Sequence, residues 1–360
     1  MTSVSVIGAG PAGLAAAIQL ARRGAHVTVY EQHRTAGSRF HGDFQAIENW
    51  TTDEDALIWL ERLGVVADFP YLSTHRLTLA DPTLAQRVAR SDRPLLYLVK
   101  RGPEADTLDR CLAAQAAACG VEFRYGCRVR PDELEGQVIV AAGPRGTQGV
   151  VVGVVAGTSH PDQVVAIASE RLAPRGYAYC VIWSGRATIA TVLVRDYRQA
   201  WVCLAAARRA FATMGLYDFQ PMCRFGGRAH ISMTGPLAAG SRFYVGEAAG
   251  LQDYLFGFGL RYAFLSGHLA ARAILTGERY EGLVARYLRG PLRAGIVGRL
   301  LYNGLRDAGY RRFVQWLGRP GDVRERANRI YTLNPLYRLL WPLARLALGP
   351  RLLADAQQTV

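Results

Sequence analysis

The first 31 residues contain the feature that most narrows the fold of this chain. A short β-branched run from Val4 leads into the turn Gly8-Ala-Gly10-Pro11-Ala12-Gly13, then an Ala- and Leu-rich segment, then a second apolar run ending at Glu31. Strand, glycine-rich turn, helix and strand in this order are typical of the unit that binds a dinucleotide. The sequence therefore predicts an α/β domain built on this unit.

Each glycine of the turn has its own physical role. Gly8 permits the tight turn, Gly10 lets the backbone approach a pyrophosphate, and Gly13 lets the helix pack closely on the strand. The start of the helix attracts phosphate charge, and Glu31 is placed to accept hydrogen bonds from an adenosine ribose. The motif does not by itself distinguish NAD from FAD. The predicted cofactor contacts here are Gly8, Gly10, Pro11, Ala12, Gly13 and Glu31.

A second glycine-rich segment favours FAD. Residues 246–259 read GEAAGLQDYLFGFG and lie between a strand-like run and a segment with small and apolar residues at helical spacing. A cofactor with a sugar-alcohol linker and an isoalloxazine ring needs such a second contact, whereas NAD does not. Glu247 is expected beside the ribityl chain or the pyrophosphate, and the turn 257–259 is expected to bring a helix start under the flavin. The predicted contacts are Gly246, Glu247, Gly257, Phe258 and Gly259.

Together these segments resemble the geranylgeranyl reductase family of FAD-dependent oxidoreductases, which shares the fold of aromatic-hydroxylase flavoproteins. The first carries the pattern GxGxxGLxxAxxLxRxGxxVxxYE, and the second carries an acid, an alanine pair, two spaced glycines and small residues in the helix that follows. Two partial matches are LDRCL at 108–112, similar to a family helix, and GYAY at 176–179, similar to the family's aromatic strand on the substrate side.

Departures from the family pattern bear on the chemistry. Glu247 stands where the family usually has Asp, and Val181-Ile182 replaces a Phe-Pro pair after the aromatic strand, which predicts a different substrate pocket. The Asp-Gly motif that often helps nicotinamide cofactors dock in related hydroxylases is not seen after residues 138–140. The electron donor is therefore left open between NAD(P)H and a ferredoxin-like protein.

The resemblance implies an α/β fold: a Rossmann-like FAD-binding domain with an inserted β-sheet substrate domain and a helical C-terminal segment. The chain of 360 residues has room for two domains at about 100–200 residues each. Strand-like runs at 179–183, 188–194 and 201–204 are expected to form the sheet over the flavin. The expected pieces are 1–48, 95–147 and 241–280 for the FAD domain, 49–94 and 148–240 for the substrate domain, and 281–360 for the basic C-terminal segment.

Candidates for further contacts and for catalysis lie in three places. In the loop after the second strand, Arg39 is expected to contact a phosphate. His41 and Asp43 either reach the active site or cap and solvate a surface loop. Tyr177 and Tyr179 in the aromatic strand, and Tyr254 in the second glycine-rich segment, are candidate proton donors, with a pocket wall as their alternative role.

Positive charge is concentrated at the C-terminal end. The formal net charge is +14, and residues 283–360 hold 14 arginines against 4 acids, a net +10. The last 30 residues place arginines and leucines on different helix faces, with Pro342 expected to kink or split the helix. This segment either lies on an anionic membrane surface or packs as a helical subdomain with solvated arginines. Nucleic acid is not expected, because no reader motif accompanies the charge.

Composition excludes several other classes of protein. The six cysteines form no CxxC pair and no metal-ligand spacing with histidine, which indicates reduced thiols and no zinc site. No secretory leader and no apolar run long enough to span a membrane are seen. We expect a cytoplasmic protein, either free or peripheral on the inner face of the membrane.

These observations predict an enzyme that uses FAD. The leading hypothesis is an oxidoreductase that reduces carbon–carbon double bonds of a hydrophobic, isoprenoid or lipid-like substrate, as the resemblance implies. The first alternative is a flavin-dependent monooxygenase, a hydroxylase or epoxidase, acting on a hydrophobic or natural-product substrate. The second is a membrane-peripheral protein that binds flavin without catalysis.

Overall fold

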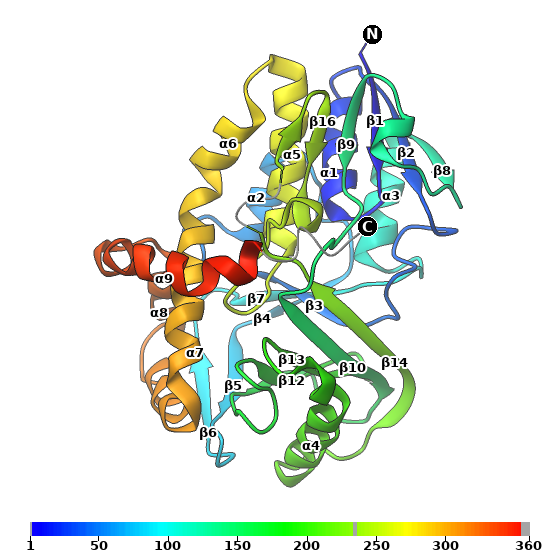
Figure 1. Cartoon of the computed structure of the whole chain (residues 1–360). Coiled ribbons are helices and arrows are strands. Elements are labelled where there is room, and N and C mark those ends of the chain that lie inside the picture. Colours follow the sequence, from blue (N-terminus) through cyan, green and yellow to red (C-terminus); the bar gives the residue numbers. More distant parts are fainter. Residues whose placement is uncertain (1, 233–235, 354–360) are drawn as a thin grey trace.

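A six-stranded sheet forms the centre of the nucleotide-binding part (Figure 1). The computed structural model describes residues 2–232 and 236–353. The sheet order is β15-β16-β9-β1-β2-β8, and all neighbours are parallel except the β15–β16 pair. This confirms the predicted Rossmann-like α/β fold. The strands are β1 (Ser3–Ile7), β2 (His26–Glu31), β8 (Glu122–Tyr125), β9 (Gln137–Val140), β15 (Ala238–Ala239) and β16 (Arg242–Tyr244).

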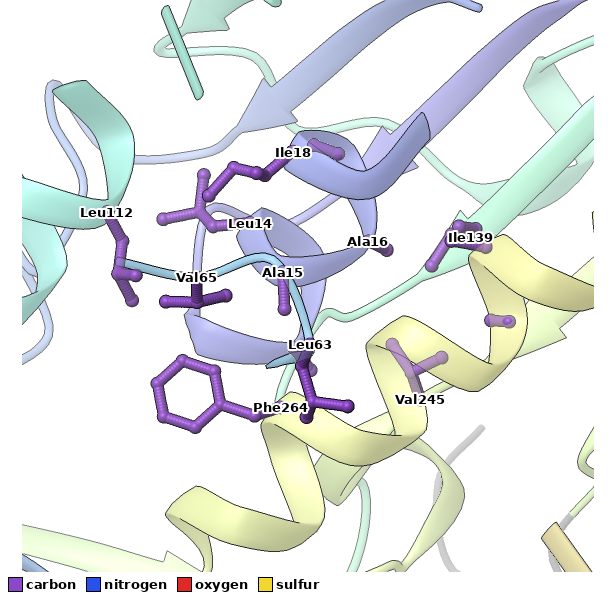
Figure 2. Close-up of a cluster of buried hydrophobic side chains, with 14 of the residues drawn as sticks. Leu14, Ala15, Ala16, Ile18, Leu63, Val65, Leu112, Ile139, Val245 and Phe264 are labelled. Carbon is purple, nitrogen blue, oxygen red and sulfur yellow. The ribbon is translucent and has the colours of Figure 1, made fainter. Parts of the chain in front are cut away.

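Helix α1 (Pro11–Ala21) packs against this sheet, and α3 (Leu108–Ala118) and α5 (Leu260–Thr276) pack against α1 in the same hydrophobic core. Figure 2 shows the core that they share, in which Leu14 and Ile18 of α1 lie near Leu112 of α3 and Phe264 of α5. The α1 and α5 backbones approach closely, since a Cβ atom on Gly267 would lie 2.1 Å from the Ala12 carbonyl oxygen. Small residues in both helices therefore fix the second glycine-rich segment beside the first.

A seven-stranded sheet, of order β14-β10-β13-β12-β11-β5-β6, forms the second layer. It is antiparallel apart from the β11–β5 pair, and α4 (Ala200–Thr213) covers one face. The strand expected at 201–204 is wrong, because these residues lie in α4. Apolar residues at helical spacing, such as Leu204, Ala207 and Phe211, bury one side of that helix. The strands are β5 (Arg76–Ala80), β6 (Gln86–Arg90), β10 (Gly149–Gly157), β11 (Gln163–Ile167), β12 (Tyr177–Trp183), β13 (Arg186–Leu193) and β14 (Gln220–Ala229).

A three-stranded antiparallel sheet of order β3-β7-β4 accompanies these layers. Its strands are β3 (Phe44–Glu48), β4 (Tyr71–Thr74) and β7 (Leu96–Lys100). Residues 49–94 are divided between layers, since α2 (Ala56–Arg62) packs into the core of α1 and α5 whereas β5 and β6 extend the seven-stranded sheet.

The C-terminal helices are α6 (Tyr280–Tyr287), α7 (Arg289–Leu317), α8 (Val323–Tyr331) and α9 (Pro335–Leu353). Helix α6 buries Leu283 and Val284 in the nucleotide-binding core, and α7 and α8 pack against the strands and loops near the substrate sheet. Helices α6 to α8 are therefore packed against the rest of the protein. Helix α9 crosses α7 and runs as one helix through Pro342, so of the two effects expected at this proline, a kink or a split, the split is wrong. None of the described helices is long and apolar enough to cross a membrane.

Candidate cofactor and substrate site

A cavity of about 850 Å³ is lined by residues from all three sheets and from the two glycine-rich segments. This volume is within the range of about 300–1,000 Å³ that is typical of small-molecule sites. One part of the lining is polar and rich in glycine, and another is apolar and aromatic. Every cofactor contact predicted from the sequence lines this cavity, except Gly13.

The glycine turn between β1 and α1 combines two structural glycines with one that leaves space. Gly8 has φ +103°, and a Cβ there would lie 2.4 Å from the Ala141 carbonyl oxygen. A Cβ on Gly13 would lie 2.2 Å from the Gly8 carbonyl oxygen, so Gly13 serves the packing of α1 on β1. No atom lies within 4 Å of a Cβ built on Gly10, the N-cap of α1. The turn thus presents backbone and open space at a helix N-terminus, where a phosphate binds favourably.

Glu31 is held beside this turn by backbone donors. Its two carboxylate oxygens accept hydrogen bonds from the N–H groups of Ala9 and His33, each at 2.9 Å. The Ala9 contact ties the end of β2 to the glycine turn, so the carboxylate faces the cavity in a fixed place. This position suits the recognition of ribose hydroxyls.

The second glycine-rich segment meets the first loop across the cavity. Arg39 Nη1 lies 3.4 Å from Glu247 Oε2. Burial raises the pKa of Glu247, and the Arg39 guanidinium opposes this shift. The short helix η3 (Gly246–Ala249) is tied to α5 by a 2.8 Å hydrogen bond from the Gly246 N–H to Ser266 Oγ. Helix α5 begins directly after the N-cap Gly259, which lines the cavity, so a second helix N-terminus lies at the site.

A buried ion pair in the cavity wall was not predicted as part of the site. Arg101 donates to both carboxylate oxygens of Asp109, at 2.8 and 2.7 Å, and its guanidinium lies 4.0 Å from the Phe40 ring centroid. All three residues line the cavity. Only Asp109 carried a signal in the sequence, through its position in the LDRCL segment. Arg101 follows a buried strand without a motif of its own.

The residues present fit FAD. Two helix N-termini, the space at Gly10, the fixed Glu31 carboxylate and the Arg39–Glu247 pair supply contacts of the kinds that phosphates, ribose and a ribityl chain require. Gln252, also in the lining, donates to the Gly257 carbonyl oxygen at 3.3 Å, and its buried Oε1 has no partner among the described residues. That acceptor suits a ligand with an N–H group. Within the described part of the chain, no cluster of His, Cys, Asp or Glu is placed to hold a metal ion.

The apolar part of the cavity lies against the substrate sheet. Tyr177 and Tyr179 of β12 line it, and the Tyr177 hydroxyl donates to the Phe256 carbonyl oxygen at 2.7 Å. Burial raises the pKa of Tyr179 well above its ordinary value. A wall of this composition suits a hydrophobic ligand. The apolar and aromatic lining residues include Phe44, Trp50, Leu77, Leu79, Leu96, Leu98, Val164, Ala166, Tyr177, Tyr179, Val181, Phe256 and Phe258.

Asp43 is a buried carboxyl group in the cavity lining. Its side chain is 4% exposed, and Oδ1 accepts a 3.0 Å hydrogen bond from the His41 N–H. Burial raises the pKa of Asp43, whereas the His41 N–H and the Arg101 charge lower it. The His41 side chain itself is exposed and outside the lining. Tyr254 also lies outside, buried in a cluster with Ala294 and Tyr337.

A second buried carboxyl group, that of Glu48 at the end of β3, is expected to make the stability of the folded protein depend on pH. Burial raises the pKa of Glu48 to about 8, although Arg261 Nε lies 3.9 Å from its carboxylate. The folded protein thus binds this proton more tightly than the unfolded chain. The stabilisation of the folded state by this proton is complete below pH 4.5 and is lost as pH rises through 8. We expect a loss of at most about 4 kcal/mol between pH 5 and pH 9.

Urea unfolding at pH 5 and pH 9 measures this dependence. The Glu48→Gln variant is expected to unfold with a free energy that changes much less between the two pH values. Glu135→Gln, which changes an exposed carboxylate, is the matched control and should behave as wild type. An unchanged pH dependence in Glu48→Gln would show that Glu48 is ionised in the folded state, as a partner of Arg261.

Comparisons with known proteins agree with this geometry. Residues 6–48 match the family model of an NAD(P)-binding Rossmann-like domain. No curated protein matches the sequence. A geranylgeranyl bacteriochlorophyll reductase-like protein from Thermoplasma acidophilum has a similar structure, with TM-score 0.73 and 18% identity over 97% of this chain and 99% of that one.

Two other solved structures share the fold. A flavin-dependent brominase has TM-score 0.69 and 15% identity over 97% of this chain and 99% of that one. The p-nitrophenol 4-monooxygenase from Pseudomonas putida has TM-score 0.60 and 14% identity over 98% and 99%. These findings support FAD as the cofactor. The chain has the Rossmann-like FAD-domain fold of the flavin-dependent oxidoreductases and monooxygenases.

Proposed function

We propose that this chain is a FAD-dependent oxidoreductase that reduces carbon–carbon double bonds of a hydrophobic, isoprenoid or lipid-like substrate. One observation supports it above the others: a single cavity joins the dinucleotide-binding turn to an apolar, aromatic wall that contains the buried carboxyl of Asp43. FAD, when bound, would supply a hydride to one carbon of the double bond. The second carbon then needs a proton.

The side chains around the cavity have three roles in this reaction: they bind the cofactor, hold the substrate and supply the proton. The glycine turn, Glu31 and the Arg39–Glu247 pair bind and orient the cofactor. The apolar wall holds the substrate and excludes water. Asp43 holds the proton, because burial keeps its carboxyl protonated at a higher pH than that of a free aspartic acid. The Tyr179 hydroxyl is the second candidate donor, since it lines the same wall.

Partner and location belong to the same proposal. The electron donor is NAD(P)H or a ferredoxin-like protein. The protein acts in the cytoplasm or at the inner face of the membrane, where lipid-like substrates are held.

Monooxygenase chemistry is the second candidate, favoured by the fold shared with a monooxygenase. One experiment separates the two functions. Dithionite-reduced protein, freed of excess reductant, is mixed without oxygen with geranylgeraniol, and flavin reoxidation and product mass are followed. We expect reoxidation and a product heavier by two hydrogens, with phytanol as the saturated control. Substrate that stays unchanged without oxygen, but gains an ¹⁸O atom under ¹⁸O₂, would identify a monooxygenase and reject the reductase.

A further inference from the structure

Helix α9 presents two apolar faces, and the rest of the protein covers one of them. Tyr337, Ala344 and Leu348 are buried in a cluster with Ala294 and Val297 of α7. This face docks α9 on α7. The arrangement explains where α9 lies but leaves its other face without a partner among the described residues.

The uncovered face carries four leucines, which we name the leucine stripe: Leu336, Leu339, Leu343 and Leu346. Their spacing of three, four and three residues places them on one side of the helix. They are 58%, 76%, 56% and 76% exposed, and Leu339 and Leu346 are the most exposed large hydrophobic side chains among the described residues. Single exposed leucines are ordinary on a protein surface, but a contiguous apolar stripe marks an interaction site.

The charged residues of α9 are all of one sign. Arg338 and Arg345 are exposed and lie between the leucines along the helix. No Asp or Glu occurs from Arg326 to Leu353, whereas five arginines do. Trp341 is partly buried on the α7-facing side of the helix, with the Arg293 guanidinium 4.9 Å from its ring centroid. A leucine face with exposed arginines on the neighbouring side of the helix is the composition of a helix that lies in a lipid interface.

The shape and charge of this surface favour a lipid surface over a second copy of the chain as the binding partner. Figure 1 shows α9 reaching past α7 to the edge of the molecule, and all four leucines of the stripe are more than half exposed. A second copy of the chain would bring the same arginines together, and their repulsion opposes such a dimer. An anionic lipid surface satisfies both the arginines and the leucines, and it needs no complementary shape.

We propose that α9 is the membrane-docking element of this protein, with the leucine stripe entering the headgroup region of an anionic lipid surface and Arg338 and Arg345 contacting lipid phosphates. This proposal rests on the proposed function in one respect only: the reason for docking, which is to bring the cavity close to a lipid-like substrate. The buried face of α9 stays on α7, so docking requires no change in the fold.

Vesicle flotation of the full chain tests this surface. We expect binding to phosphatidylglycerol–phosphatidylcholine vesicles at least tenfold tighter than to phosphatidylcholine alone. The triple variant Leu339→Ser, Leu343→Ser, Leu346→Ser should bind at least tenfold more weakly at any salt concentration. Arg338→Gln with Arg345→Gln should weaken binding at low salt and reduce its salt dependence. Val202→Ser on α4, which changes a side chain 68% exposed, is the matched control.

Three results would overturn the proposal. They are absence of wild-type binding to anionic vesicles, binding unchanged in the triple variant, and a wild-type dimer in light scattering that the triple variant converts to monomers. The last result would assign the stripe to self-association. FAD content and reduction of a water-soluble short-chain isoprenoid are measured on the same samples. Their failure with intact vesicle binding would reject the proposed function alone.

Discussion

Gly10→Val is expected to give a folded protein that no longer holds FAD. No atom lies within 4 Å of a Cβ at this position, and its φ of −88° is one that valine adopts, so the fold accommodates the side chain. The valine occupies the space in which a pyrophosphate approaches the backbone. We expect FAD affinity to fall at least 100-fold, and thermal unfolding of the FAD-free protein to change by only a few degrees.

Gly13→Val is the contrasting variant in the same turn. Its Cβ would lie 2.2 Å from the Gly8 carbonyl oxygen, inside the packing of α1 on β1, so we expect loss of folding and of flavin together. Circular dichroism and flavin absorbance on both variants separate the two roles. A Gly10→Val protein with wild-type FAD content would show that the cofactor does not pass over this turn.

Replacing Asp43 is expected to remove catalysis while leaving the cofactor in place. Asp43→Asn keeps the size of the side chain but offers no acidic proton, and general acids contribute about 10²–10⁴-fold to rates. We therefore expect kcat to fall at least 100-fold with FAD content unchanged. Stopped-flow reoxidation of the reduced protein by the unsaturated substrate measures this step.

The pH dependence of the activity tests whether Asp43 acts as an acid. Because Asp43 acts as an acid with a raised pKa, activity should be constant at low pH and fall as pH rises through that pKa. Asp43→Asn should lack this descending limb, and Asp43→Glu should keep it at reduced rate. Full activity in Asp43→Asn, with a large loss in Tyr179→Phe, would assign the proton to the tyrosine instead.

The cofactor-binding part of the site could be predicted from the sequence because it requires particular residue types at particular positions. A backbone at φ +103° and a close helix approach need glycine, and Gly8 and Gly13 occur at the spacing that the turn demands. The second segment was predictable for the same reason, since a glycine directly precedes α5. The Arg101–Asp109 ion pair could not be predicted, because its two residues come together only when folding brings β7 and α3 together.

The other differences have local causes. Tyr254 belongs to a segment that lines the cavity, yet the Asp253 carboxylate accepts the N–H groups of Leu255 and Phe256 and turns the chain so that Tyr254 faces α7. Residues 201–204 were predicted as a strand from their apolar character, but Trp201 and Val202 are exposed on α4. The exposure of the leucine stripe depends on which face of α9 docks on α7, and amphipathic periodicity does not fix this when both faces are apolar.

The central claim is that this cavity binds FAD, and the visible spectrum of the purified protein tests it most directly. The protein is incubated with excess FAD, desalted, and its bound flavin is released and quantified. We predict visible flavin bands and about one FAD per chain in wild type, with no such bands in Gly10→Val. A folded wild-type protein that stays colourless after incubation would contradict the account.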